Sequence, residues 1–160
     1  MKLFTDYQLA IIQFCAEECA RLRSGELSVS GMLQAYQYAA LHYSVVQDIT
    51  PEDNAAMAAM INPEKNARGY RQVPVHFGDF NILPWENVPQ QVSTLLAAQD
   101  SLSAGDFCLQ YQGVHPHAAG NGHLASILFN VKNGTLFCPV CPPPFEKRAI
   151  VVAGFAQPRA

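Results

Sequence analysis

The segment His115-Pro116-His117-Ala118-Ala119-Gly120-Asn121-Gly122-His123 lies where a loop runs into an apolar helix, which we expect over roughly residues 122–131. Glycines at such a junction let successive backbone N–H groups turn inward, and the helix end adds partial positive charge. This combination binds phosphate. Asn121 tolerates a left-handed backbone and can hydrogen-bond locally or to a ligand. A neutral imidazole at His115 is a competent general base for a hydroxyl. The alternative interpretation is a glycine-rich helix start with incidental histidines.

Outward from this loop, most of the chain has helical periodicity. Apolar residues at helical spacing predict helices over residues 5–23, 30–47, 51–61, 86–99 and 103–113. Thr50-Pro51-Glu52-Asp53 has a capping residue, a proline and early acids, which is a strong helix start. Asn62-Pro63 is expected to break that helix, and Asn133-Gly134 to end the helix that follows the loop.

The period changes between Gly69 and Pro84. Apolar residues alternate with other residues through Val73, Pro74, Val75, His76 and Phe77, and Gly78-Asp79 offers a turn. This pattern predicts a short β-hairpin, and Pro74 means that it is not a central strand. The sequence therefore predicts one mainly α domain over residues 1–160, a helical bundle with a short β-hairpin.

Composition limits the partners. The 160 residues are 49% hydrophobic and 14% charged, and the net charge is −3 without a Lys/Arg cluster, so we do not expect nucleic acid as a partner. No apolar run approaches the roughly 20 residues that span a bilayer, so we expect no membrane contact. Five cysteines without a secretory signal indicate reduced thiols. We expect a cytoplasmic protein, or one delivered into a host cell without a classical signal peptide.

The segment His-Pro-x-x-x-Gly-Asn-Gly at 115–122 resembles the core of the Fic (Fic/Doc) family motif, HPFx(D/E)GNGRxxR. Residues 67–75, Ala-Arg-Gly-Tyr-Arg-Gln-Val-Pro-Val, look like the segment that leads into that family's substrate-aligning flap, and Pro84 to Leu96 look like the turn and helix after it. The resemblance covers roughly residues 30–131. The N-terminal helix and the Pro/Cys-rich tail are additions to it.

The resemblance implies a Fic-like helical bundle and a function. Fic enzymes usually transfer the nucleoside monophosphate of ATP to a Ser, Thr or Tyr hydroxyl of a protein (AMPylation), and some act as toxins or effectors. His115 would be the catalytic base. The phosphate- or nucleotide-binding group would be Ala118, Ala119, Gly120, Asn121, Gly122 and His123, with Asn121 orienting the phosphates. Val73, Pro74, Val75, His76 and Phe77 would be the flap that adds the target segment as an extra strand.

Four positions depart from the family motif. Ala119 replaces the acid that holds Mg²⁺, so the protein ligand for magnesium is missing. His123 and Ser126 replace the two arginines, and His117 replaces the phenylalanine that anchors the loop. Phosphoryl transfer depends on charge neutralisation, so we expect the usual ATP-dependent reaction to be slow or absent. The pattern [ST]-x-x-x-E-[GN] of the family's inhibitory helix is absent, so regulation would come from a partner or from the site itself.

Three hypotheses remain open. The chain is a transferase with altered chemistry, which uses His117 or His123 for charge and ATP or another nucleotide as donor. Or it is a catalytically weak or inactive Fic-like pseudoenzyme that binds a nucleotide or a partner protein. Or His115, His117 and His123 bind a metal. A separate zinc site at Cys138 and Cys141 with Cys15 and Cys19 is also open, although core thiols and a loop are the alternative.

Overall fold

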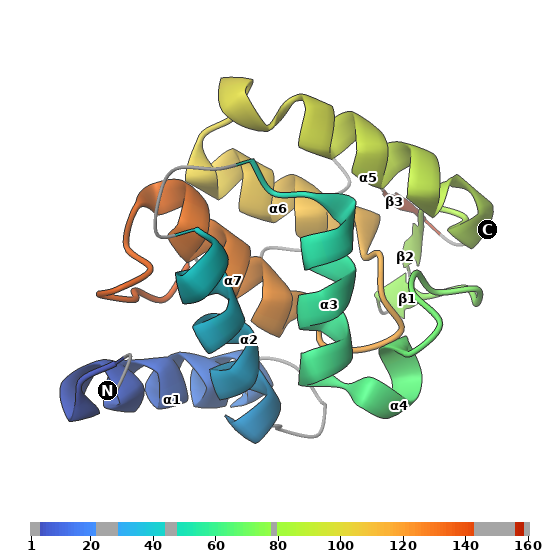
Figure 1. The fold of residues 1–160 in the computed structure, drawn as a ribbon. Coiled ribbons are helices and arrows are strands. Elements are labelled where there is room, and N and C mark those ends of the chain that lie inside the picture. Colours follow the sequence, from blue (N-terminus) through green and yellow to red (C-terminus); the bar gives the residue numbers. More distant parts are fainter. Residues whose placement is uncertain (1–3, 22–28, 44–47, 78–79, 143–155, 159–160) are drawn as a thin grey trace.

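The structure is a computed structural model that describes residues 4–21, 29–43, 48–77, 80–142 and 156–158. These residues form a mainly helical fold, as predicted (Figure 1). The α-helices described are α1 (Asp6–Arg21), α2 (Val29–His42), α3 (Pro51–Ile61), α4 (Pro63–Asn66), α5 (Val88–Ala97), α6 (Ala104–Val114) and α7 (Asn121–Asn133). Two short 3₁₀ helices, η1 (Trp85–Asn87) and η2 (Gln99–Ser101), flank α5.

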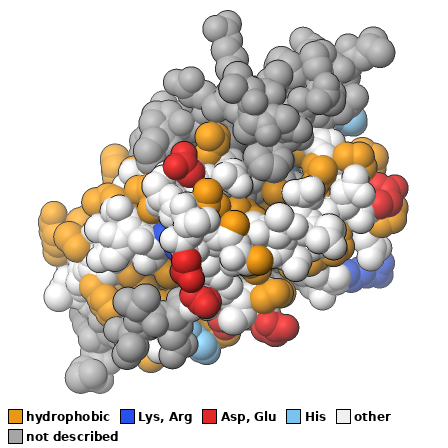
Figure 2. All heavy atoms as spheres, turned by 90° about the horizontal axis from the view of Figure 1, so that it is seen from above, with side chains coloured by type: hydrophobic (Ala, Val, Ile, Leu, Met, Phe, Trp, Pro, Cys, Tyr) orange, Lys and Arg blue, Asp and Glu red, His pale blue; other side chains and the backbone are white. Residues whose placement is uncertain are grey.

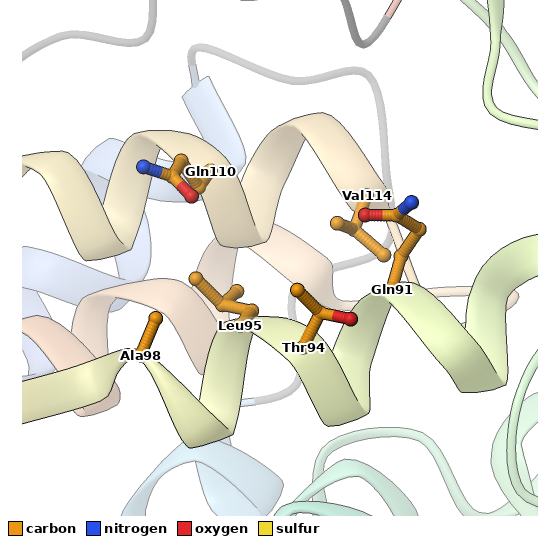
Figure 3. Close-up of a pocket in the computed structure, with 6 residues that line it drawn as sticks. All are labelled: Gln91, Thr94, Leu95, Ala98, Gln110 and Val114. Atoms are coloured by element: carbon orange, nitrogen blue, oxygen red, sulfur yellow. The ribbon is translucent and has the colours of Figure 1, made fainter.

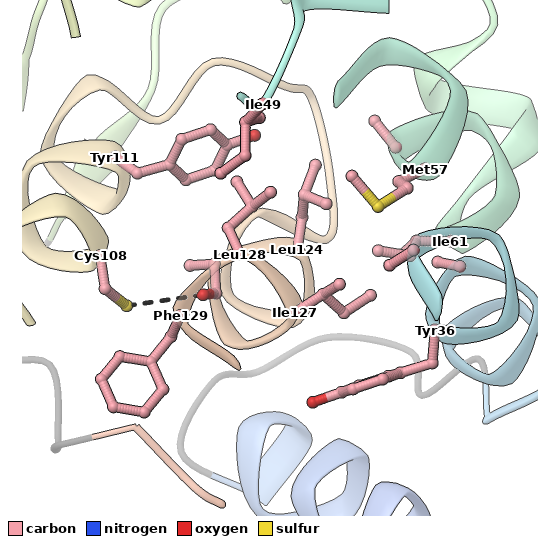
Figure 4. Packing of buried hydrophobic residues seen from close by; sticks show 14 of the residues in the cluster. Tyr36, Ile49, Met57, Ile61, Cys108, Tyr111, Leu124, Ile127, Leu128 and Phe129 are labelled. Carbon is pink, nitrogen blue, oxygen red and sulfur yellow. Dashed lines mark hydrogen bonds between the residues drawn. The ribbon is translucent and has the colours of Figure 1, made fainter. Parts of the chain in front are cut away.

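Helix α7 is the centre of the packing. Residues 121–130 are buried without interruption, and α1, α2, α3 and α6 all pack against this helix. Apolar side chains from α7, including Leu124, Ile127 and Leu128, meet Tyr36, Met57 and Tyr111 from the surrounding helices (Figure 4). Because α7 is surrounded, its N-terminus is fixed in place by the bundle, and so is the loop that precedes it.

The helix ends follow the capping chemistry in the sequence. The Thr50 side chain accepts a hydrogen bond from the Asp53 amide at the start of α3, and Ser103 does the same for Asp106 at the start of α6. Helix α7 ends at Gly134, which has a left-handed backbone with φ of 70°. The predicted start at Thr50-Pro51 and the predicted end at Asn133-Gly134 are therefore confirmed.

Several helix boundaries differ from the predictions. Helix α2 ends at His42, and residues 44–47 of the predicted 30–47 helix lie outside the described residues. The predicted 86–99 helix is divided into η1 and α5. At Asn62-Pro63 helix α3 stops as expected, but α4 begins at once, because the Asn62 side chain accepts from the Lys65 amide and Pro63 occupies the first helical position.

Short strands lie in the segment where the hairpin is predicted. Strand β1 (His76–Phe77) pairs antiparallel with β2 (Phe80–Ile82), and β2 pairs antiparallel with β3 (Ala156–Pro158), so the order is β1-β2-β3. The predicted turn at 78–79 lies outside the described residues. In Figure 1 the strands lie on the side of the molecule away from α1. No periodicity in the sequence predicted β3.

Charged side chains are few on the face of the molecule that Figure 2 shows, in line with a composition of only 14% charged residues. Among the described residues, every helix is too short or too polar to cross a lipid bilayer.

Candidate functional site

The loop between α6 and α7 passes α4 and the start of β1 (Figure 1). Gly120 precedes α7 with a left-handed backbone, φ of 74°, in which a side chain is strained. A Cβ atom on Gly120 would lie 2.5 Å from Cγ2 of Ile61 at the end of α3. Gly120 is therefore required by both its backbone conformation and its close approach to α3, whether or not the loop binds a ligand.

Two asparagines fix the path of the loop. The buried Asn121 side chain accepts from the His117 amide at 2.9 Å and donates to the His117 carbonyl at 2.8 Å. Asn66, at the end of α4, accepts from the Ala119 amide at 3.2 Å and donates to the Ala119 carbonyl at 3.0 Å. Asn121 thus acts on the loop backbone, and its expected role in orienting the phosphates of a ligand stays a prediction.

These bonds leave part of the predicted phosphate-binding group available. The Ala119 amide is already bound to Asn66. Among the described residues, no hydrogen bond involves the amides of Ala118, Gly120 or Asn121. Ala118 is exposed and Gly120 is partly exposed, and the first turn of α7 contains no acidic residue. The end of the loop can therefore present N–H groups and the positive end of a 13-residue helix to an anion.

His117 lies in the core rather than in an open site. Its side chain is fully buried, and its Nε2 lies 3.3 Å from Nδ2 of Asn54 on α3. Asn54 in turn accepts from the Tyr111 hydroxyl of α6 at 2.7 Å. Burial raises the pKa of Tyr111 well above its usual value, so Tyr111 remains the donor, Asn54 Nδ2 donates to His117, and the proton of the His117 ring is on Nδ1.

Burial disfavours a positive charge on the His117 ring. Burial lowers its pKa to about 4, opposed only weakly by the Gly69 backbone. Nδ1 has no hydrogen-bond partner with ordinary geometry among the described residues, so the Gly69 contact is a weak one. Its burial and lowered pKa speak against the expected positive charge at His117, because desolvation disfavours the imidazolium. His117 occupies the anchoring position of the loop, and it does so through Asn54.

Arg71 joins the loop to the segment that carries the strands. Its guanidinium is buried and donates to the carbonyls of His115 at 2.7 Å, Val73 at 3.0 Å and Leu83 at 2.6 Å, with a longer contact to Val114 at 3.4 Å. Its own amide donates to the Pro116 carbonyl at 2.9 Å. One side chain therefore fixes the start of the loop and both ends of the 73–83 segment. No pattern in the sequence indicates this role for Arg71, which depends on partners far along the chain.

His115, the predicted base, ends α6 with a left-handed backbone, φ of 50° and ψ of 60°. It is the only described residue other than glycine with positive φ. Its amide donates to the Tyr111 carbonyl at 3.1 Å; the residue is partly exposed, but the Nδ1 atom of its ring is buried. Glycine is the unstrained residue at this kind of helix end, and a side chain there costs about 1 kcal/mol. The imidazole is thus held at the start of the loop in spite of backbone strain.

The predicted flap residues lie beside this point. Val73 is 54% exposed, Pro74 and His76 are exposed, and Val75 is partly buried. The side chain of Phe77 lies outside the described ones, although its backbone belongs to β1. Arg71 places the base of this segment next to His115.

The remaining predicted positions lie inside the fold. His123 is 9% exposed and Ser126 is fully buried, both on α7. In the part of the chain that the structure describes, no group of three or more His, Cys, Asp or Glu side chains is placed to hold a metal. The hypothesis that His115, His117 and His123 bind a metal therefore has no support. Cys138 and Cys141 are exposed, but the side chains of Cys15 and Cys19 lie outside the described ones.

A small hollow between α5 and α6 lies apart from these residues (Figure 3). Its lining is Gln91, Thr94, Leu95, Ala98, Gln110 and Val114. None of residues 115–123 lines it, and its volume of about 60 Å³ is too small for a nucleotide. It is not a candidate for the predicted donor site.

No protein-family model and no curated protein matches this chain.

Proposed function

We propose that this chain is a Fic-like domain that binds a phosphate-containing ligand, such as a nucleotide, at the end of the 115–122 loop, and that its capacity for group transfer is weak or lost. The hairpin segment at 73–82 would bind an extended segment of a partner protein. The amides of Ala118, Gly120 and Asn121, which have no partner among the described residues, carry the binding part of this proposal.

The charge of the site supports binding over transfer. Ala119 offers no oxygen to a cation, and His117 stays neutral at physiological pH. The guanidinium of Arg71 is occupied by backbone carbonyls, so it is not available to a phosphate. Backbone amides can bind an anion without these groups, but transfer also requires neutralisation of the charge that develops on the phosphoryl oxygens.

Ligand binding is tested by titrating the ¹⁵N-labelled chain with ATP, GTP and inorganic phosphate. We expect the largest shifts at the amides of Ala118, Gly120 and Asn121. The variant Ala118→Pro removes one of these N–H groups and should weaken binding several-fold, while Ala118→Ser keeps the N–H and should bind normally. Shifts confined to other parts of the chain, or none with any of the three ligands, would contradict the proposal.

One observation favours a second candidate, a transferase that uses His115 as its base. The strained backbone at His115 is the kind of feature that accompanies functional residues, and Arg71 fixes the carbonyl of the same residue. The test is incubation with labelled nucleotides and lysate, wild type against His115→Ala. Transfer of label that His115→Ala abolishes would support this candidate. If label is not transferred from any donor while nucleotide binding persists, the transferase candidate is excluded and the binding role stands.

A further inference from the structure

The outer edge of β2 is already occupied by the end of the chain. Strand β3 pairs with β2 in the register Phe80–Pro158, Asn81–Gln157 and Ile82–Ala156. Figure 1 shows β3 beside β2. The last described residues of the chain thus lie where an extended peptide would add to the sheet.

The register shows which backbone groups join the two strands. The Ile82 amide donates to the Val75 carbonyl at 3.3 Å, so the polar groups of Ile82 point toward β1. Backbone polar groups alternate in direction along a strand, so those of Asn81 point the other way, toward its pair residue Gln157. Pro158 is opposite Phe80, whose groups face β1, and the missing N–H of proline therefore costs nothing at that position.

We infer that β3 is a resident occupant of the β2 edge, which an extended peptide of a partner protein must displace before it can add to the sheet. The inference rests on the partner-binding role proposed for the 73–82 segment and is independent of phosphate binding.

Two properties of the β2–β3 pair fit a replaceable occupant. Only three residue pairs form it, and only one of them, Asn81 with Gln157, has its backbone groups facing across the gap. Each hydrogen bond contributes little net free energy, because both groups bond to water when the strands separate, so such a short ladder is weak by itself. The covalent connection to the rest of the chain compensates, because it gives the tail an effective concentration in the millimolar range. A partner that offers a longer strand would compete successfully.

The test uses the full chain and changes the one residue that joins the strands. Gln157→Pro removes the N–H that faces Asn81, while Gln157→Ala retains it and is the matched control. Hydrogen exchange at the Asn81 amide should be at least ten-fold faster in Gln157→Pro than in the wild type, and unchanged in Gln157→Ala. The melting temperature of each variant shows whether the rest of the fold is intact.

A synthetic peptide with the sequence of residues 153–160 then serves as the extended ligand, without nucleotide. At millimolar concentration it should restore slow exchange at Asn81 in Gln157→Pro, and it should bind the wild type at least ten-fold more weakly. A peptide with proline at the position of Gln157 should have no effect. Unchanged exchange in Gln157→Pro, or equal binding of the peptide to both chains, would overturn the inference. Phosphate titration of the same samples shows separately whether the proposed ligand site is intact.

Discussion

The 115–122 loop and the 73–82 segment are neighbours, but they are held in place very differently. The loop is bound by buried side chains from several elements, including Asn66, Arg71 and Asn121. The 73–82 segment is anchored at its two ends by Arg71 and is otherwise held by short strands, with Val73 54% exposed. Buried, fully bonded groups are costly to move, whereas short exposed strands are not.

This difference suggests a division of roles. The loop keeps one shape, as a binding site for a small anion requires, because its amides must be aimed before the ligand arrives. The 73–82 segment can exchange one strand partner for another, as β-augmentation requires. Arg71 is the point at which the two regions meet, so changes there should have the largest effect.

Replacement of Arg71 by alanine is expected to be the most damaging change. It leaves the partly buried carbonyls of His115, Val73 and Leu83 without their donor, which should lower the free energy of unfolding by about 3–5 kcal/mol in total. The melting temperature should fall by roughly 10 °C, measured by circular dichroism. Arg68→Ala, at an exposed position nearby, is the control and should stay within about 0.5 kcal/mol. Equal stability of the two variants would show that Arg71 does not connect the regions.

A second change separates backbone strain from packing at the loop. Gly120 and Gly134 both have left-handed backbones, but a Cβ meets Ile61 only at Gly120 and has open space at Gly134. We expect Gly134→Ala to cost about 1 kcal/mol, from conformation alone. Gly120→Ala should cost about 3 kcal/mol, because a clash in a packed site is added. Chemical denaturation measures both values. A similar cost at the two positions would mean that Ile61 on α3 moves to accommodate the added methyl group.

His117 predicts a pH dependence of stability. Its pKa is about 4 when folded and near 6.5 when unfolded, so the unfolded chain binds the proton first as the pH falls. The contribution of His117 to the free energy of unfolding is therefore fully present above pH 6.5 and is lost progressively toward pH 4. Between pH 7 and pH 5 the loss is about 2 kcal/mol. His117→Phe should be less stable at pH 7, because Asn54 Nδ2 loses its partner, but should lose less stability on acidification. Guanidinium unfolding at both pH values tests this. The same acid loss in both proteins would assign the dependence to other groups.

The smallest effect is expected in the 73–82 segment. Val73 is 54% exposed, and its backbone carbonyl accepts a hydrogen bond from the Arg71 side chain. Val73→Thr should change the free energy of unfolding by less than about 0.5 kcal/mol, measured by denaturation. A loss comparable to that of Gly120→Ala would contradict the view that this segment is only loosely packed.

Local chemistry determined much of the fold from the sequence alone. Thr50 and Pro51 start α3, and Asn133-Gly134 ends α7. These features depend on interactions between residues a few positions apart, which a single sequence contains in full. The sequence also identified the junction of the 115–122 loop with α7.

The tertiary structure alone decided what the side chains of that loop do. His117 is a neutral core residue because Asn54 and Tyr111, from two other helices, surround it. Arg71 joins carbonyls separated by more than forty positions in the chain, and β3 pairs with a strand over seventy positions away. Protonation and pairing of this kind depend on burial and on distant partners. No local pattern in the sequence encodes burial or distant partners, and these determine whether a histidine side chain is charged or is a neutral part of the core.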